Sequence, residues 1–232
     1  MLSLYTFQLL EEGEFNRFYP EICSQLPISV QQKVDTFRFP ADKQRSLMGD
    51  LMVRKFYSQK LNQNPKEIDF EYTEHQKPLL KNVDGEYFNI SHSGNYVVVA
   101  FSDKPVGIDV ELIKKDRRNI AERFFTPSEI IDMNAAGTEE EQIKYFYQLW
   151  TLKESYMKAI GDGLTMSLSS FSFAKNEEGY YLSKSKYGSD WFFHSQEWNG
   201  DAFLSICSKY PQIQNQSPFE IELARKLFTS SA

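Results

Sequence analysis

The sequence predicts an α+β fold, and three observations support this prediction. Strand-forming segments occur in both halves of the chain, helical segments occur in both halves, and a short polar stretch, "SDKP" at 102–105, separates the halves. The 232 residues suffice for one large domain or two small ones. We therefore expect two subdomains, residues 1–103 and 104–232, each of which mixes helices with strands.

In the first half, helices are expected to precede strands. The segment "SVQQKVDTFRF" begins with Ser29, a good helix cap, and predicts a short helix. Residues 41–61 predict a long amphipathic helix, because their apolar side chains recur every three or four positions. The turn composition of "HSGN" indicates a hairpin between two of the strands. Strands are expected at 68–72, 87–91 and 95–101.

The second half opens with a strand-like segment, "VGIDVEL" at 106–112, after which helices are expected from about 120 to 160. In "FFTPSEI", Thr126 and Glu129 form a capping-box pattern, so Glu129 is assigned to the start of a helix. The Gly-rich "GDGLT" at 161–165 lacks the spacing of a phosphate-binding loop and predicts a helix end. Strands are then expected at 170–175, 180–185, 191–198 and 201–208, followed by a helix at 222–228.

The composition narrows the classes of function. The net charge of −6 argues against general nucleic-acid binding, which needs a basic surface. The beginning of the chain lacks the basic region of a secretory signal, and no apolar run approaches the roughly 18 residues that span a bilayer. Cys23 and Cys207 are far apart and belong to no metal-binding pair, which favours reduced packing residues. We expect a cytoplasmic protein that binds neither nucleic acid nor membrane.

Two acidic residues, Asp109 and Glu111, lie at the end of the strand-like segment "GIDVE". Residues two apart on a strand point to the same face, so these carboxylates are expected side by side. Like charges on one face repel unless a positive group sits between them. The pair therefore indicates either a solvated strand edge or half of a cation site.

A third acidic residue interrupts the apolar pattern of the predicted helix that contains "LWTLKESYMKAI". Glu154 is four residues after Trp150, at a position where the helical spacing calls for an apolar side chain. A charge there is costly unless it is paired or bound to a ligand. Glu154 is therefore either a metal ligand or a rim residue paired with Lys158, one helical turn further on.

Together, three carboxylates would provide an all-oxygen site that suits Mg²⁺. Zinc is not expected, because the chain has only three histidines and no paired ligand motif.

Three further segments carry polar residues that suit a phosphate or form ordinary turns and surfaces. Ser91 and His92 are neighbours in a predicted strand, so they point to opposite faces and do not form a nucleophile and base. Phosphate binding or local hairpin bonds suit them better. Arg45 lies near the start of the long helix, where an anion is favoured, although a solvated basic face is the alternative. Lys77 precedes Pro78, which suits either a rigid ligand contact or a simple turn.

Taken together, these segments resemble the 4′-phosphopantetheinyl transferase family, and most closely its surfactin-synthetase-activating type, which primes nonribosomal peptide synthetases in antibiotic biosynthesis. The resemblance covers nearly the whole chain except its last 30 or so residues. The motifs that carry it are "RFPADKQRSLMGDLMVR", "KPLL", "FNISHSG", "VGIDVE", "FFTPSE" and "LWTLKESYMKAIGDGL".

The resemblance implies a pseudo-dimer of two similar α+β subdomains with the active site between them. It implies transfer of phosphopantetheine from coenzyme A to a serine of a peptidyl or acyl carrier protein, with release of adenosine 3′,5′-bisphosphate. By matching positions, Asp109, Glu111 and Glu154 would hold Mg²⁺. Glu154 would also be the first candidate to accept the serine proton, and Lys158 would stabilise charge on the phosphoryl oxygens.

The resemblance also implies a set of residues that bind coenzyme A. One departure concerns Lys33, the nearest equivalent of lysines that the family carries in a slightly longer segment. The set that matches the family comprises Arg45, Ser46, Lys77, Pro78, Ser91, His92, Lys153 and Lys158.

Two other functions share parts of this pattern. Another metal-dependent phosphate-ester enzyme, such as a phosphodiesterase, would use the same acids but usually needs more acids or histidines. A non-enzymatic coenzyme A-binding module would not need Glu154. The segment "KKDRR" at 114–118 is either a docking patch for acidic carriers or a solvated loop. A fused pseudo-dimer has no need of a second chain, so we expect a monomer.

Overall fold

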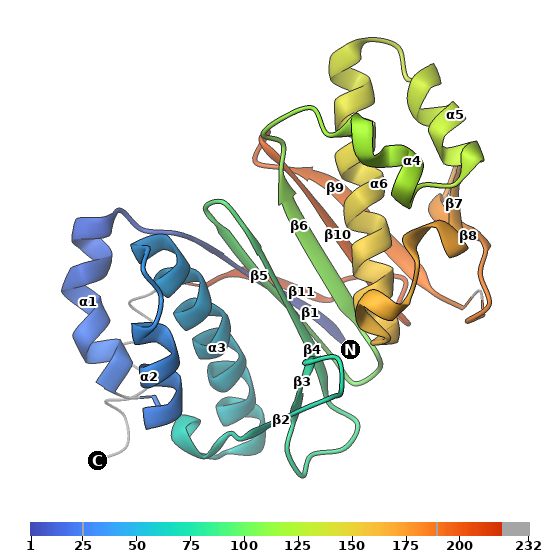
Figure 1. Cartoon of the computed structure of the whole chain (residues 1–232). Helices are drawn as coiled ribbons and strands as arrows, with labels where there is room; N and C mark the ends of the chain where they lie inside the picture. Colours follow the sequence, from blue (N-terminus) through green and yellow to red (C-terminus); the bar gives the residue numbers. More distant parts are fainter. Residues whose placement is uncertain (25, 189, 220–232) are drawn as a thin grey trace.

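The computed structural model describes residues 1–24, 26–188 and 190–219 (Figure 1). The first half of the chain forms five strands, three in a main sheet and two in a separate hairpin, with the helices packed on one side of the main sheet. Its elements are β1 (Leu2–Gln8), α1 (Glu12–Ser24), α2 (Ile28–Asp35), α3 (Pro40–Leu61), the 3₁₀ turn η1 (Pro65–Glu67), β2 (Phe70–Tyr72), β3 (Pro78–Leu80), β4 (Tyr87–Ser93) and β5 (Tyr96–Ser102).

The second half repeats this plan and adds one strand. Its elements are β6 (Gly107–Leu112), η2 (Arg118–Ile120), α4 (Ala121–Phe124), α5 (Pro127–Ala135), α6 (Glu139–Ile160), η3 (Gly163–Thr165), η4 (Leu168–Ser170), β7 (Ser172–Asn176), β8 (Gly179–Lys184), β9 (Phe192–Trp198), β10 (Ala202–Ser208) and β11 (Asn215–Pro218).

The two halves share their strand order. The first sheet runs β1-β5-β4 and the second runs β6-β10-β9, all antiparallel, so β1, β4 and β5 correspond to β6, β9 and β10. Each half contains a helix of 22 residues, α3 or α6, followed by a two-stranded hairpin, β2–β3 or β7–β8. The expected architecture of two similar α+β subdomains is confirmed.

Most predicted elements form where the sequence placed them. The turn between β4 and β5 contains Gly94 with φ of 54°, a conformation that glycine adopts readily. Gly161 ends α6 in the left-handed conformation, as predicted for "GDGLT". The short helix α2 begins one residue before Ser29 and follows Pro27, so Ser29 is not its cap. The strands β1, β3 and β11 and the helix α1 were not predicted, and the helix expected at 222–228 lies outside the described residues.

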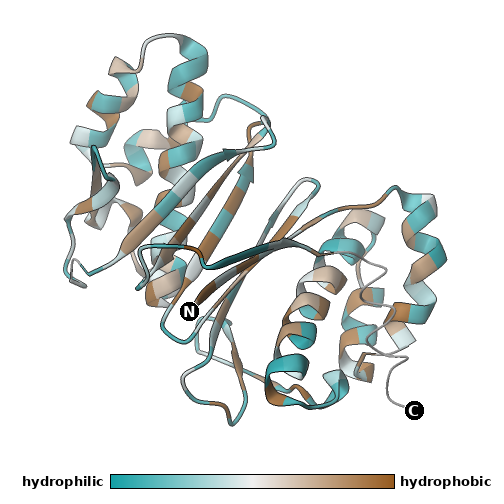
Figure 2. Cartoon of the chain, turned by 180° about the vertical axis from the view of Figure 1, so that it is seen from behind, coloured by the Kyte–Doolittle hydropathy of each residue, from teal (hydrophilic) through white to brown (hydrophobic). Residues whose placement is uncertain are grey.

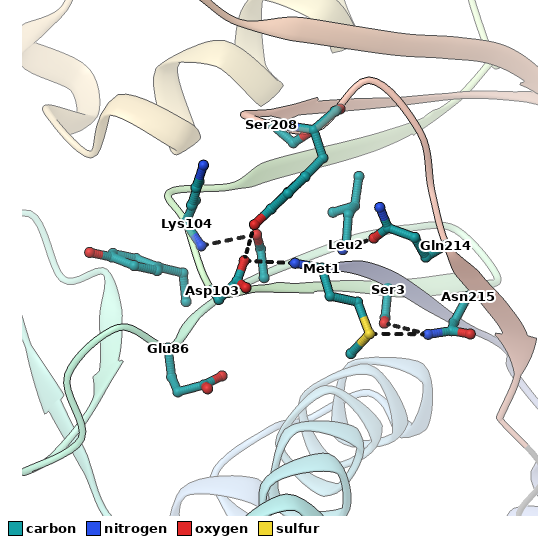
Figure 3. Close-up of polar contacts among 12 residues, drawn as sticks. Met1, Leu2, Ser3, Glu86, Asp103, Lys104, Ser208, Gln214 and Asn215 are labelled. Atoms are coloured by element: carbon teal, nitrogen blue, oxygen red, sulfur yellow. Dashed lines mark hydrogen bonds and ion pairs between the residues drawn. The ribbon is translucent and has the colours of Figure 1, made fainter.

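The end of the described chain returns to the first sheet. β11 pairs in parallel with β1, and Ser3 lies opposite Asn215 in this register. Figure 3 shows the surrounding polar contacts, in which Asp103 accepts a bond from the Met1 ammonium group at 2.8 Å. The Tyr210 hydroxyl donates to the same Asp103 oxygen at 2.7 Å. A division of the chain after residue 103 falls between β5 and β6, while residues 215–218 lie in the sheet of the first half.

Three apolar clusters hold the fold together. One lies between the first sheet and its helices, a second lies under α6, and a third fills the space between the two sheets. Strand alternation explains the third cluster, because Val97 and Val99 face the helices whereas Val98 faces the second sheet. Figure 2 shows hydrophobic residues along these central strands and mostly hydrophilic residues on the outer helix faces. Within the described ranges, no helix has both the length and the apolar character required to cross a bilayer.

Helix α6 lies directly on the backbone of β6 at Gly107. A Cβ atom at this position would lie 2.0 Å from the carbonyl oxygen of Ser155 and 2.4 Å from the amide nitrogen of Ala159. Both atoms belong to the helix backbone, which a neighbouring side chain cannot displace cheaply. The absence of a side chain at 107 thus allows the helix to approach the strand that carries Asp109 and Glu111.

A buried ion pair lies on the opposite side of α6. Lys153 is fully buried and its ammonium group lies 2.9 Å from the Glu129 carboxylate. The same nitrogen donates to the carbonyl oxygens of Leu168 and Phe171. Glu129 accepts bonds from the amides of Thr126 and Phe173, so its predicted place at a helix start is confirmed. Burial lowers the pKa of Lys153 to about 8, against the opposing effect of Glu129.

The structure gives Lys153 other partners than the coenzyme A that the family resemblance implies. The side chain points into the core of the second half, where a carboxylate and two carbonyl oxygens use its hydrogen-bonding capacity. The family motif places a lysine beside Glu154, but neighbouring helical residues point in directions about 100° apart. Of the two, Glu154 lies near the charged residues Asp109 and Glu111 of β6.

We predict that Gly107→Ala destabilises the fold by about 3 kcal/mol, because the added methyl group meets helix backbone. Thermal unfolding should occur roughly 6–12 °C lower. The matched control is Gly13→Ala, where an added Cβ meets no atom within 4 Å. A Gly107→Ala protein as stable as the wild type would contradict the close approach of α6.

We also predict that Lys153→Met lowers the unfolding temperature by roughly 6–20 °C, since an unpaired buried Glu129 costs about 3–5 kcal/mol. Combining it with Glu129→Gln should restore part of the loss, because no buried charge remains. Folded Lys153→Met protein should keep a KM for coenzyme A close to that of the wild type. A large rise in this KM without a change in stability would indicate that Lys153 does bind coenzyme A.

Candidate active site

The edge strands β4 and β6 of the two halves lie side by side and are joined by side chains. Three β4 residues accept hydrogen bonds from alternate amides of β6. Asn89 accepts from Ile108 at 2.8 Å, and Ser91 accepts from Val110 at 3.2 Å. Ser93 accepts from Leu112 at 3.1 Å. We call this junction the β4–β6 seam.

Strand alternation sends the intervening β4 residues to the other face. Phe88, Ile90 and His92 line a cavity of about 300 Å³ in the first half. Ser91 and His92 thus point in opposite directions, so the expectation that they do not form a catalytic dyad is confirmed.

The seam places Asp109 and Glu111 on one face of β6, as predicted. Asp109 is buried, and one of its oxygens accepts bonds from Ser91 at 2.8 Å and from Lys158 at 2.6 Å. Glu111 accepts a bond from Ser93 at 2.8 Å. Burial and the charge of Asp109 raise the pKa of Glu111. The alternative of a solvated strand edge does not fit this buried arrangement.

Helix α6 adds Glu154 and Lys158 to the same region. Lys158 forms its ion pair with Asp109, and among the described residues no ion pair joins it to Glu154. The alternative of a rim residue paired with Lys158 is therefore not what the structure contains. Burial raises the pKa of Glu154 to about 7, with further contributions from Asp109 and Glu111 and an opposing one from Lys158. The three carboxylates thus share one electrostatic environment.

The carboxylates suit a hard divalent cation in their chemistry. The second oxygen of Asp109 is buried and has no hydrogen-bond partner, and the Glu154 carboxylate accepts no hydrogen bond from any part of the chain that the structure describes. Repulsion among the three acids would be relieved by a positive ion. Across the described ranges, however, no three His, Cys, Asp or Glu side chains are gathered into a complete set of ligands. Lys158 is the positive charge that Asp109 contacts.

The hydroxyl of Ser91 is fully committed within the seam. A serine hydroxyl offers one donor and two acceptor positions. Ser91 donates to Asp109 and accepts from Val110 and Lys158, the latter at 3.2 Å. It has no donor left for a phosphate oxygen, which differs from the role that the family resemblance implies. In this structure Ser91 orients Asp109.

The first cavity gathers several of the predicted ligand-binding residues. Arg45 lies at its wall, where its guanidinium group donates to the carbonyl oxygen of Gly94 at 2.6 Å and to Asp42. His92 is near it, and partial burial together with the Arg45 charge lowers the pKa of His92. Other residues at this wall are Lys33, Ser46, Phe37, Phe70, Tyr72 and Pro78.

A second cavity of about 230 Å³ lies between the two halves. It shares Gln76 and Pro78 with the first cavity, so the two adjoin. Lys77 lines it and donates to the carbonyl oxygen of Lys158 at 2.6 Å, near the end of α6. Burial lowers the pKa of Lys77 to about 8. The two adjoining cavities thus extend from the first half to the end of α6 in the second half.

The structure brings together most of the residues that the sequence singled out. Lys153 is the clear exception, and Ser91 takes a different role. Sequence reasoning did not identify Asn89 and Ser93, although their two-residue spacing from Ser91 was visible. It also did not identify Gln76, whose backbone has φ of 60° where the cavities meet. Glutamine carries no signal for that conformation.

Comparisons with known proteins place most of the chain in one enzyme family. The model of the "4'-phosphopantetheinyl transferase, N-terminal" family matches residues 16–104, and that of the "4'-phosphopantetheinyl transferase superfamily" matches residues 105–207. A 4'-phosphopantetheinyl transferase of Bacillus subtilis is 32% identical over 212 residues, which cover 91% of this chain and 92% of the relative. 

Two further relatives are similar over about three quarters of the chain. The 4'-phosphopantetheinyl transferase Sfp of Bacillus subtilis (strain 168) is 36% identical, with 76% of this chain and 77% of the relative covered. The 4'-phosphopantetheinyl transferase gsp of Aneurinibacillus migulanus is 37% identical, with 78% and 76% covered. With two family models in tandem and relatives matched over most of their length, the chain belongs to the 4′-phosphopantetheinyl transferase superfamily.

Proposed function

We propose that this phosphopantetheinyl transferase moves the phosphopantetheine group of coenzyme A to a serine of a peptidyl or acyl carrier protein in a Mg²⁺-dependent reaction at the β4–β6 seam. The observation that carries the proposal is the meeting of Asp109, Glu111, Glu154 and Lys158 beside two adjoining cavities. The division into residues 1–103 and 104–232 is retained as a proposal, with the β11 segment lying in the first sheet.

Coenzyme A is assigned to the two cavities. Aromatic side chains such as Phe70 and Tyr72 line the first cavity and suit a purine base, whereas Arg45, Lys33 and His92 suit phosphate groups. Lys77 and Lys158 line the second cavity, nearer the carboxylates, and suit the pyrophosphate. Ser46 and Pro78 complete the wall.

The carboxylates would hold Mg²⁺ between the protein and the pyrophosphate. Asp109, Glu111 and Glu154 are the residues that would bind the ion, which would neutralise charge on the phosphate oxygens. Lys158 is positioned to add a second positive charge for the departing bisphosphate. Lys77 donates to the main chain at Lys158 and so supports that end of the helix.

Glu154 is the carboxylate best placed to accept the proton of the carrier serine. One oxygen of Asp109 accepts bonds from Ser91 and Lys158, and one oxygen of Glu111 accepts a bond from Ser93. Glu154 accepts none from the residues described, so its lone pairs are available to the incoming hydroxyl or to a water that relays the proton. The serine oxygen then attacks the phosphorus that carries the pantetheine, a new P–O bond forms, and the pyrophosphate P–O bond breaks to release adenosine 3′,5′-bisphosphate.

The direct test is the intact mass of an apo carrier protein after incubation with enzyme, coenzyme A and Mg²⁺. The expected result is a gain of one phosphopantetheine group, which disappears with excess EDTA and returns with added Mg²⁺. Hydrolysis of phosphate esters without carrier modification would favour a phosphodiesterase instead. Coenzyme A binding with no turnover on any carrier would favour a binding module. Full turnover after EDTA treatment would contradict the proposed requirement for Mg²⁺.

Arg45→Ala should raise the KM for coenzyme A roughly ten- to a hundredfold, because a charge-assisted bond to phosphate is worth about 1.5–3 kcal/mol. Steady-state kinetics with both substrates varied provides the measurement. Lys43→Ala is the matched control, since Lys43 lies on the same helix turn, pairs with Asp35 and does not line the cavity. An effect of Arg45→Ala confined to the carrier's KM would move Arg45 to the docking surface.

Glu154→Gln should lower kcat by roughly 10²-fold or more, because Gln keeps the shape but neither holds a cation nor accepts a proton as a carboxylate does. The unfolding temperature should stay unchanged or rise, since a half-buried charge is removed. Coenzyme A should still bind through Arg45 and the lysines. Glu140→Gln, an exposed change on the same helix, serves as control. Near-normal turnover of folded Glu154→Gln protein would exclude Glu154 from the chemistry.

A further inference from the structure

The seam contains a second hydroxyl group, to which the proposed reaction assigns no role. Ser93, the last residue of β4, accepts a hydrogen bond from the Leu112 amide at 3.1 Å and donates one to the Glu111 carboxylate at 2.8 Å. Ser93 belongs to the first half of the chain and Glu111 to the second. The Ser93 hydroxyl thus links the first half to two groups of β6, the Leu112 amide and the Glu111 carboxylate.

This contact is the only side-chain hydrogen bond that Glu111 makes to the described residues. A glutamate side chain has three rotatable bonds, and Glu111 lies next to the like charge of Asp109. Without a partner, repulsion would favour rotamers that turn the carboxylate away from Asp109. The Ser93 bond selects one orientation instead.

The position of Ser93 is itself fixed by close packing. The next residue is Gly94, and a Cβ atom there would lie 1.7 Å from Leu112 Cδ1. Leu112 therefore packs on the backbone of the β4–β5 turn, directly beside the Ser93–Leu112 hydrogen bond. Arg45 donates to the carbonyl oxygen of the same glycine. These contacts fix the position of the Ser93 hydroxyl along the length of β6.

We propose that Ser93 is a positioning residue that holds the Glu111 carboxylate in the orientation in which Asp109, Glu111 and Glu154 take up a divalent cation. It repeats, two residues further along β4, the arrangement of Ser91 with Asp109. The inference rests on the proposed metal-dependent function and adds that each β6 carboxylate is oriented by the other half of the chain. Cation affinity then depends on the register of the β4–β6 seam.

The test measures cation binding directly. Mn²⁺ is titrated into protein saturated with coenzyme A, and free Mn²⁺ is followed by its electron paramagnetic resonance signal. Ser93→Ala should bind Mn²⁺ about tenfold more weakly than the wild type, a change of about 1.4 kcal/mol. Ser93→Thr keeps the hydroxyl and should restore most of the affinity. The Mg²⁺ concentration for half-maximal transfer should move in parallel with these values.

Two controls separate positioning from general stability. Ser208→Ala removes a fully buried hydroxyl that bonds Tyr210 outside the seam, so it should lower the unfolding temperature without changing Mn²⁺ affinity. In a double-mutant cycle, Ser93→Ala should have little further effect on Mn²⁺ binding once Glu111→Gln is present, since Ser93 acts through Glu111.

The outcomes distinguish this inference from the proposed function. Wild-type affinity for Mn²⁺ in folded Ser93→Ala protein overturns the positioning role while leaving the metal site intact. Additive effects of Ser93→Ala and Glu111→Gln overturn it as well. No Mn²⁺ binding by the wild type would instead overturn the metal-dependent function and, with it, this inference.

Discussion

The hydrogen bonds of the β4–β6 seam are the interaction on which the site depends. An edge strand presents amides that need hydrogen-bond acceptors. In β6 these acceptors are side chains of β4 rather than the backbone of a neighbouring strand. A backbone partner would form a continuous sheet. A side-chain partner keeps the strands further apart, and both hydroxyl groups, those of Ser91 and Ser93, also donate to carboxylates. The same bonds therefore join the halves and orient the acids.

The corresponding edge of the first sheet, at β1, has no such seam because another strand pairs with it. β1 corresponds to β6, but β11 pairs with β1 along its backbone. The helices α3 and α6 are equally long, and counting from their first residues places Lys55 where α6 has Glu154. Lys55 is buried, and its ammonium group lies 5.3 Å from the centre of the Phe219 ring. The first half thus lacks the acidic partner, and its edge is already occupied.

Helix α6 separates two kinds of charge that are adjacent in sequence. Lys153 and Glu129 form a dry pair that anchors the helix to α5 and β7, whereas Glu154 and Lys158 face the seam. Gly107 allows the helix to lie on the strand between these two regions. A buried pair contributes little net stability but becomes costly when one partner is lost. Lys153 therefore has a structural partner, although it is adjacent in sequence to Glu154.

The sequence by itself determined the α+β class, most helices and strands, and the pairing of Asp109 with Glu111 on one face, because periodicities of 2 and 3.6 residues are local properties. It also marked Glu154 as out of place in an apolar pattern. Only the tertiary structure decided which partners these groups meet. Lys158 contacts Asp109 rather than Glu154, Lys153 turns into the core, and Ser91 and Ser93 reach across to β6. These contacts join residues far apart in the chain, and their geometry follows from how α6 and the two sheets pack, which no local pattern encodes.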